Sequence, residues 1–288
     1  MSENCENGIN RNKINWFPGH MKKTIDELVK KVKLCDVVLY VLDARAPFST
    51  LNPKFKNIIS NKPIIFVFNK IDFVDEKKLD SYISKLESEN TRCVKICSTK
   101  QNSYKEIVNL INTFMIKKLE RNKQKGINIP LRAMVIGVPN VGKSTLINNF
   151  AGKNKLLAKN MPGVTKSTAW VKVDGNIELL DTPGTLWPNL DNEIVAHHLA
   201  YIGSIKDDVL VLTDLAFNFI SELAPKFGEM FKQRYNIEID GLSTIEIFDS
   251  ICLKRGFIMK NREIDYERGA KAILDDFRKG RIGKIILD

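Results

Sequence analysis

The stretch that decides the fold reads GVPNVGKST and spans residues 137–145. It fits the GxxxxGK[ST] pattern, follows the apolar run Ala133–Ile136 and precedes a helical pattern that begins near Lys143. Glycines let backbone N–H groups approach phosphate oxygens, and the start of the helix attracts the same anion. We expect Lys143 to reach the β- and γ-phosphates and Ser144 to ligate Mg²⁺. The pattern predicts a nucleoside triphosphate site, and by itself it leaves a kinase or an ATPase open. The loop residues expected to contact the nucleotide are Asn140, Val141, Gly142, Lys143, Ser144 and Thr145.

A phosphate-sensing motif follows the strand predicted for Ile177–Leu180. The chain reads DTPG from Asp181 to Gly184, which matches DxxG. Asp181 can hold Mg²⁺ directly or through water, and Gly184 can turn its backbone N–H toward the γ-phosphate. Thr165 lies between the two motifs and can add its hydroxyl to the Mg²⁺ shell when the γ-phosphate is present. We therefore expect Mg²⁺ as a cofactor, held by Ser144, Thr165 and Asp181.

A guanine-reading motif, NKID, follows the apolar run Ile64–Phe68. The Asp72 carboxylate can accept hydrogen bonds from N1–H and from the exocyclic amine of guanine, whereas adenine has neither donor. Lys70 is expected to lay its aliphatic stem on the base, and Asn69 to brace the surrounding loops. The motif predicts GTP as the nucleotide. The alternative is a chance NKID in an ATPase.

The order of the motifs along the chain is unusual. Asn69–Asp72 precedes the phosphate loop by more than sixty residues. The CSTK segment, in which Cys97 and Ser98 are expected to contact the nucleotide, also precedes it. Most GTPases place the phosphate loop first. A circularly permuted sheet reconciles the order, because the same strands still meet in space while the chain ends lie elsewhere. The new junction is expected near Leu119–Asn128.

Short apolar runs alternate with amphipathic stretches over the first two thirds of the chain. Strands are expected at Val37–Leu42, Ile64–Phe68, Cys93–Cys97, Ala133–Ile136, Trp170–Val173 and Ile177–Leu180. Helical periodicity covers Lys77–Lys85, Tyr104–Glu120, Ile194–Tyr201, Ile220–Phe231, Ile245–Lys254 and Tyr266–Lys279. The alternation predicts an α/β fold, a mostly parallel sheet with helices on both faces, followed by an all-helical part. We expect a permuted GTPase domain at residues 1–190 and a helical domain at residues 191–288.

The chain of 288 residues is basic, with a net charge of +11 and a pI of about 9.3. Residues 1–189 hold 31 Lys or Arg against 17 Asp or Glu. Such a balance favours anionic partners such as nucleic acid or an acidic membrane surface, although simple solubility explains it equally well. The sequence shows no signal-peptide pattern, no transmembrane run and no zinc or disulfide spacing among its five cysteines. We expect a cytoplasmic protein.

The motifs together resemble the circularly permuted GTPases, and most closely the ribosome biogenesis GTPase A family. The resemblance covers nearly the whole chain. The segments that carry it are 16–21 (WFPGHM), 43–47 (DARAP), 69–72, 137–145, 162–165, 181–184, 186–188 (LWP) and 254–256 (KRG).

The resemblance implies a factor that binds the large ribosomal subunit, its rRNA and its proteins, late in assembly. It implies hydrolysis of GTP to GDP and phosphate that the subunit stimulates, an RNA-binding helical tail, and a monomer away from the ribosome. Many GTPases orient the attacking water with a glutamine just after DxxG, where this chain has Thr185. The family assigns that work to a histidine that corresponds to His20, whose other interpretation is docking of the amino-terminal segment. Asn140 matches an asparagine that helps hold K⁺ in related GTPases.

Alternative functions remain open at this stage. Basic runs at Lys30–Lys33, Arg121–Lys125 and Arg278–Lys284 are candidate RNA contacts, though each alone is typical of a solvated face. A GTPase acting on another RNA or on a membrane-associated partner fits the same motifs. Thr185 also fits a nucleotide-gated scaffold without catalysis. We assign no role to the adjacent His197 and His198.

Overall fold

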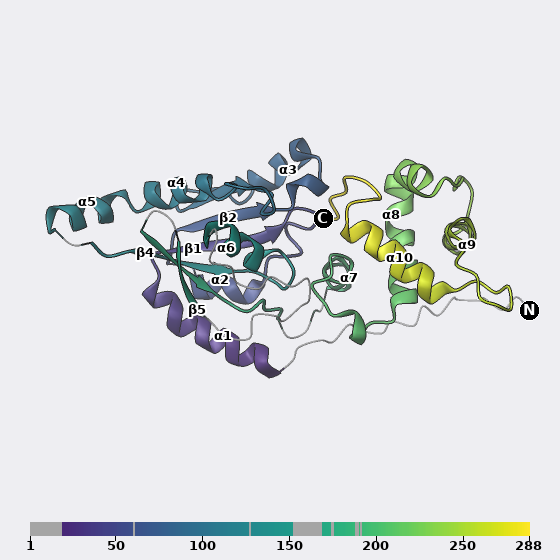
Figure 1. The fold of residues 1–288 in the computed structure, drawn as a ribbon, viewed down its shortest axis with the longest axis horizontal. Helices are drawn as coiled ribbons and strands as arrows, with labels where there is room; N and C mark the ends of the chain where they lie inside the picture. Colours follow the sequence, from purple (N-terminus) through teal and green to yellow (C-terminus); the bar gives the residue numbers. More distant parts are fainter. Residues whose placement is uncertain are drawn as a thin grey trace, which may run out of the picture.

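The computed structural model describes residues 19–59, 61–126, 128–151, 169–173, 176–187, 190 and 192–288. These residues form a six-stranded sheet in the order β3-β2-β1-β4-β6-β5 (Figure 1). Neighbouring strands are parallel except β5 and β6, which form an antiparallel pair. The strands are β1 (Val37–Asp43), β2 (Ile64–Asn69), β3 (Thr91–Lys95), β4 (Leu131–Ile136), β5 (Ala169–Val173) and β6 (Ile177–Asp181). This order of strands in the sheet confirms the permuted α/β fold.

The register brings the ends of four strands to one edge of the sheet. Asp43 at the end of β1 lies opposite Asn69 at the end of β2. Asp181 at the end of β6 lies opposite Val135 of β4. Because ligands of open α/β sheets bind outside the carboxyl ends of the strands, this edge is where a nucleotide site is expected.

Both faces of the sheet are covered, which explains why β1 is apolar from Val37 to Leu42. Val37, Leu39 and Val41 belong to one hydrophobic cluster, and Val38, Tyr40 and Leu42 belong to the other. Helices in the first part of the chain are α1 (Gly19–Lys31), α2 (Pro53–Ile59), α3 (Glu76–Ile83), α4 (Lys105–Phe114), α5 (Ile116–Gln124) and α6 (Lys143–Ala151). Short 3₁₀ helices lie at Val32–Leu34, Ile71–Phe73 and Asp207–Val209.

The C-terminal helices are α7 (Glu193–Tyr201), α8 (Leu212–Tyr235), α9 (Thr244–Arg255) and α10 (Tyr266–Arg278). In Figure 1, α8, α9 and α10 gather beyond one end of the sheet, α7 lies between them and the sheet, and the end of the chain returns to the sheet. Their buried residues continue the hydrophobic cluster that contains Val37 and Leu39. Of the helices in the described part of the chain, none combines the length and the apolar character that crossing a bilayer requires.

The segment Leu119–Asn128, near which the junction is expected, includes the second half of α5. Helix α5 continues as far as Gln124, so most of this segment is helical and the link to β4 is short. Helix α5 has no buried residue and extends away from the sheet at the far left of Figure 1. The helical periodicity expected for Tyr104–Glu120 covers α4 and the first half of α5, and Met115 separates the two helices.

Candidate nucleotide-binding site

The phosphate loop connects β4 to α6 at the edge of the sheet. Gly142 has a φ of +99°, and a Cβ on it would lie 2.2 Å from Nδ2 of Asn69. Only glycine allows this approach. Val141 is buried, while Ser144 and Thr145 are half-buried in the first turn of α6. The loop and the start of the helix therefore have the arrangement that binds phosphates through backbone N–H groups.

Asn69 joins the phosphate loop to the CSTK segment, residues 97–100, which we call the base loop. Its Nδ2 donates to the carbonyl oxygen of Val141 at 2.7 Å, and its Oδ1 accepts from the backbone N–H of Ser98 at 3.0 Å. The side chain is 1% exposed. The NKID segment and the phosphate loop, far apart in the sequence, are thus held together by one buried amide.

Lys70 follows in the left-handed conformation, with a φ of 65°. Its Nζ donates to the carbonyl oxygen of Asn140 at 2.7 Å and lies 2.9 Å from Oδ2 of Asp43. Burial lowers the pKa of Lys70, and the Asp43 carboxylate opposes that effect. Asp72 lies in the following 3₁₀ turn with its side chain exposed.

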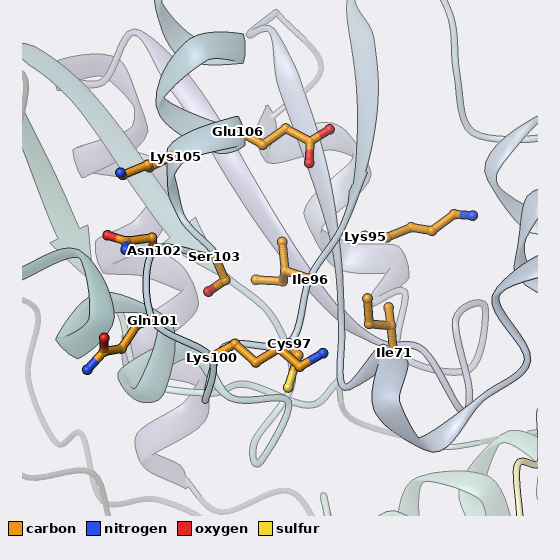
Figure 2. A pocket seen from close by; sticks show the side chains of 10 residues that line it. All are labelled: Ile71, Lys95, Ile96, Cys97, Lys100, Gln101, Asn102, Ser103, Lys105 and Glu106. Carbon is orange, nitrogen blue, oxygen red and sulfur yellow. The ribbon is translucent and has the colours of Figure 1, made fainter.

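Helix α6 holds the base loop through the side chain of Asn149. Asn149 of α6 donates to the carbonyl oxygens of Ser98, at 2.9 Å, and of Lys100, at 2.5 Å. Cys97 and Ser98 are buried. A surface hollow of about 420 Å³ lies beside this loop, with Ile71 and Lys95 on one side and polar side chains of the α4 start on the other (Figure 2). Its lining residues are Ile71, Lys95, Ile96, Cys97, Lys100, Gln101, Asn102, Ser103, Lys105 and Glu106.

Lys143 folds back on its own loop. Its Nζ donates to the carbonyl oxygens of Gly137 at 3.0 Å and Val138 at 2.8 Å. Burial lowers the pKa of Lys143 to about 8, although the nearby Asp181 carboxylate works in the opposite direction. Phosphate oxygens would replace the two carbonyls as partners of a fully charged ammonium group.

The DxxG segment packs against the phosphate loop. A Cβ on Gly184 would lie 2.7 Å from Cα of Pro139 and 3.0 Å from Nζ of Lys143. Thr185 is fully buried, and its backbone N–H donates to the carbonyl oxygen of Gly137 at 3.4 Å. The segment therefore lies where a γ-phosphate on the loop would meet its backbone.

Two of the sequence-predicted residues are not placed by the structure. Thr165 lies outside the described residues. His20 is the second residue of α1, but its side chain lies outside the described part of the chain. Asn140, the candidate K⁺ ligand, donates from Nδ2 to the carbonyl oxygen of Gly203 at 2.9 Å.

Sequence reasoning missed two sets of buried polar contacts, of which one adjoins Lys70. Asp43 and Arg45 form an ion pair beside Lys70, and the sequence marked them by a carboxylate at the end of an apolar strand and by the DARAP segment of the family resemblance. His198, to which we assigned no role, is 2% exposed and hydrogen bonds to Ser49, Glu222 and Asp288. These partners come from distant parts of the chain, so no local pattern announces them.

Comparison with known proteins agrees with this geometry. Residues 132–254 match a family model described as 50S ribosome-binding GTPase. Ribosome biogenesis GTPase A of Priestia megaterium is 38% identical over 277 residues, covering 96% of each chain. Mitochondrial ribosome-associated GTPase 1 of Ictalurus punctatus is 31% identical, covering 95% of this chain and 92% of its own.

A solved structure has the same fold. The crystal structure of GNP-bound YlqF from T. maritima superposes with a TM-score of 0.63 at 25% identity, covering 93% of this chain and 97% of that one. Similarity of this extent, over nearly the whole length of several relatives, establishes the family and the GTPase class. The protein belongs to the ribosome biogenesis GTPase A family, with a circularly permuted P-loop GTPase sheet and a helical C-terminal part.

Proposed function

We propose that this GTPase acts in late maturation of the large ribosomal subunit and that the edge described above is its GTP site. The observation that carries the proposal is the pair of hydrogen bonds in which Asn69 donates to the carbonyl oxygen of Val141 and accepts from the backbone N–H of Ser98. They bring a guanine motif, a base loop and a phosphate loop to one place although the chain order is permuted. The names of the family model and of the relatives, which refer to the 50S subunit and to ribosome biogenesis, support the partner.

The base side of the site reads guanine through Asp72. Its exposed carboxylate accepts the two N–H donors that distinguish guanine from adenine, and a mismatch leaves that charge without them. The stem of Lys70 lies on the base face while its ammonium group stays bound to Asn140 and Asp43. Backbone groups at Cys97 and Ser98 complete the base loop.

The phosphate side combines backbone N–H groups with Lys143. Members of a GTPase family use Mg²⁺, and the residues here fit it, because the Ser144 hydroxyl and the buried Asp181 carboxylate are hard oxygen donors beside the loop. Thr165 would be the third protein ligand. Bound Mg²⁺ neutralises charge on the β- and γ-phosphates. The backbone N–H of Gly184 then meets the γ-phosphate.

We assign to His20 the task of orienting the water that attacks the γ-phosphate. Thr185 stands where many GTPases have glutamine, but it is buried against the phosphate loop and does not face the solvent. An imidazole from the amino-terminal motif is the group of suitable pKa that the family resemblance supplies. A K⁺ ion near Asn140 would add positive charge at the phosphates.

Basic surfaces of the protein contact the ribosomal subunit. Helix α5 carries Lys117, Lys118, Arg121 and Lys123 and projects beyond the sheet (Figure 1). We propose that residues 191–288 form the RNA- and ribosome-binding domain and that the protein is a cytoplasmic monomer when it is not bound to the subunit. Phosphate contacts of this kind weaken as the salt concentration rises.

The test is GTP hydrolysis with and without 50S subunits, in K⁺ and in Na⁺, for the native protein and for His20→Ala. We expect stimulation by subunits in K⁺ that His20→Ala abolishes while GTP affinity is unchanged. Stimulation that survives in His20→Ala would remove His20 from the chemistry. Absence of any stimulation by subunits would refute the ribosomal role itself.

A further inference from the structure

A buried set of charges connects the proposed base reader to the C-terminal helices. Asp43, at the end of β1, is fully buried. Its Oδ2 accepts from Nζ of Lys70 at 2.9 Å and from Nη2 of Arg45 at 2.7 Å, and its Oδ1 accepts from Nε of Arg45 at 2.9 Å. Burial alone would raise the pKa of Asp43, but the charges of Arg45 and Lys70 hold it well below its usual range. One carboxylate therefore fixes two cations.

Arg45 also reaches the end of α10. Its Nη1 donates to the carbonyl oxygens of Arg278 at 3.1 Å and Phe277 at 3.4 Å. The guanidinium carbon lies 5.2 Å from the ring centroids of both Phe73 and Phe277. The last carbonyls of a helix lack intrahelical partners and carry partial negative charge, so a cation stabilises them. Since Phe73 directly follows Asp72, the guanidinium group is clamped between the base motif and α10.

We propose that Asp43 and Arg45 are positioning residues that couple guanine binding to docking of the C-terminal helices. A docked α10 holds Arg45, which fixes Asp43, which in turn holds Lys70 where its stem covers the base. By linkage, docking strengthens guanine binding by the same factor by which guanine strengthens docking. The inference rests on the proposed assignment of Lys70 and Asp72 to the base.

Contacts on the phosphate side keep the helices in place when Arg45 is changed. The Ser204 hydroxyl donates to the carbonyl oxygen of Pro139 at 2.7 Å, and Asn140 donates to Gly203 at 2.9 Å. Gly203 and Ser204 lie directly after α7. An Arg45 variant therefore loses the charged connection to the base without losing the whole interface.

The charge pattern distinguishes coupling from simple packing. Truncating Arg45 leaves the Asp43 carboxylate with one cation, while Arg45→Lys preserves that charge but cannot hold the carboxylate and two carbonyls together, because it has a single terminal nitrogen. We expect Arg45→Lys to keep the charge that holds Asp43 and Lys70 but to lose the connection to α10, so GDP affinity should fall less than in Arg45→Gln while the response of α10 to GDP is lost. A purely structural residue would not separate these two properties.

The experiment measures GDP affinity together with hydrogen exchange at the backbone amides of residues 275–281. In the native protein, GDP is expected to slow exchange at these amides. Arg45→Gln should weaken GDP binding by about tenfold and remove the GDP-dependent slowing. The matched control is Arg255→Gln, because Arg255 also donates to a carbonyl oxygen, that of Arg234 at 3.0 Å, and lies over the Tyr235 ring, but within the C-terminal helices.

A second variant keeps the test decisive if Arg45→Gln does not fold. Asp43→Asn combined with Arg45→Gln removes one buried charge of each sign, so the net charge of the set is unchanged, and Lys70 keeps its hydrogen bond to the carbonyl oxygen of Asn140. GDP-dependent slowing that persists in this folded double variant overturns the coupling. An equal loss of GDP affinity in Arg255→Gln overturns it too.

Failure of the coupling is distinguishable from failure of the base assignment. Asp72→Asn is expected to move the preference from guanosine to xanthosine nucleotides, because the amide donates where the carboxylate accepted. If that change of preference occurs and Arg45→Gln behaves like the native protein, the coupling is refuted and the base assignment stands. If Asp72→Asn leaves the base preference unchanged, the base assignment is the part that fails.

Discussion

Replacing His198 is expected to change how the stability of the protein depends on pH. The imidazole is 2% exposed, with Nδ1 at 3.0 Å from the Ser49 hydroxyl and 3.1 Å from the Asp288 carboxylate, and Nε2 at 2.8 Å from Glu222. Burial alone would lower the pKa of His198, but the hydrogen bonds to Asp288 and Glu222 outweigh it and raise the pKa to about 9. The charged imidazolium therefore joins the loop after β1, α8 and the final residue.

The direction of the effect follows from the two pKa values. The folded-state value of about 9 lies above the unfolded value of about 6.5, so the stabilisation is fully present below pH 6.5 and is lost as the pH rises through 9. Between pH 6.5 and 8 the folded state keeps a proton that the unfolded state releases. Integrated over this window, the contribution of His198 to the free energy of unfolding falls by about 1.5 kcal/mol.

Urea unfolding at pH 6.5, 7.25 and 8, for the native protein and for His198→Gln, measures this contribution as the difference between the two proteins. Taking the difference cancels every group that both share. His197→Gln is the matched control, because His197 is adjacent on α7 but burial lowers its pKa, so its own effect falls below pH 6.5. A difference between the native protein and His198→Gln that does not change across the window would refute the reasoning.

Two further perturbations test the nucleotide site. At pH 8.5, GDP binding should take up about three quarters of a proton, because phosphates raise the lowered pKa of Lys143, which is about 8, and at pH 7 about a tenth. Calorimetry in buffers of different ionisation enthalpy measures this, and heats independent of the buffer would contradict it. Gly142→Ala places a methyl group 2.2 Å from Nδ2 of Asn69 and should cost about 2 kcal/mol or more in urea unfolding and abolish GDP binding. Gly241→Ala, at a φ of +76° with no atom within 4 Å of its Cβ, should cost only about 1 kcal/mol of backbone strain, and equal losses in both variants would contradict the close contact.

Strands buried on both faces could be predicted from the sequence to within a residue or two, because most positions in them are apolar. The prediction at Cys93–Cys97 was displaced, since β3 spans Thr91–Lys95. Only Val94 is buried in this edge strand, while Ile96 and Cys97 are buried just after it ends. The apolar signal therefore marked the core beneath the sheet edge and not the strand itself.

Helices were predictable where an apolar stripe repeats over several turns, as in α9 and α10. Helix α2 spans Pro53–Ile59, which is too short to show a period, and it was not predicted. In the site, the residue types and spacing of NKID and GVPNVGKS predicted a joint base and phosphate site. The roles of Arg45 and His198 depend on partners more than twenty residues away, and such contacts follow from the fold and not from any local pattern.

The permuted strand order has a consequence for synthesis of the chain. Strand β1 pairs with β2 on one side and with β4 on the other, and β4 begins only at Leu131. On the ribosome, β2 and β3 emerge well before β4, so the nascent sheet exposes one whole edge of its most apolar strand during that interval. An open apolar edge of this kind invites pairing with other chains. The same chain order that puts the guanine motif first therefore leaves β1 without its second neighbour until residues 131–136 have been made.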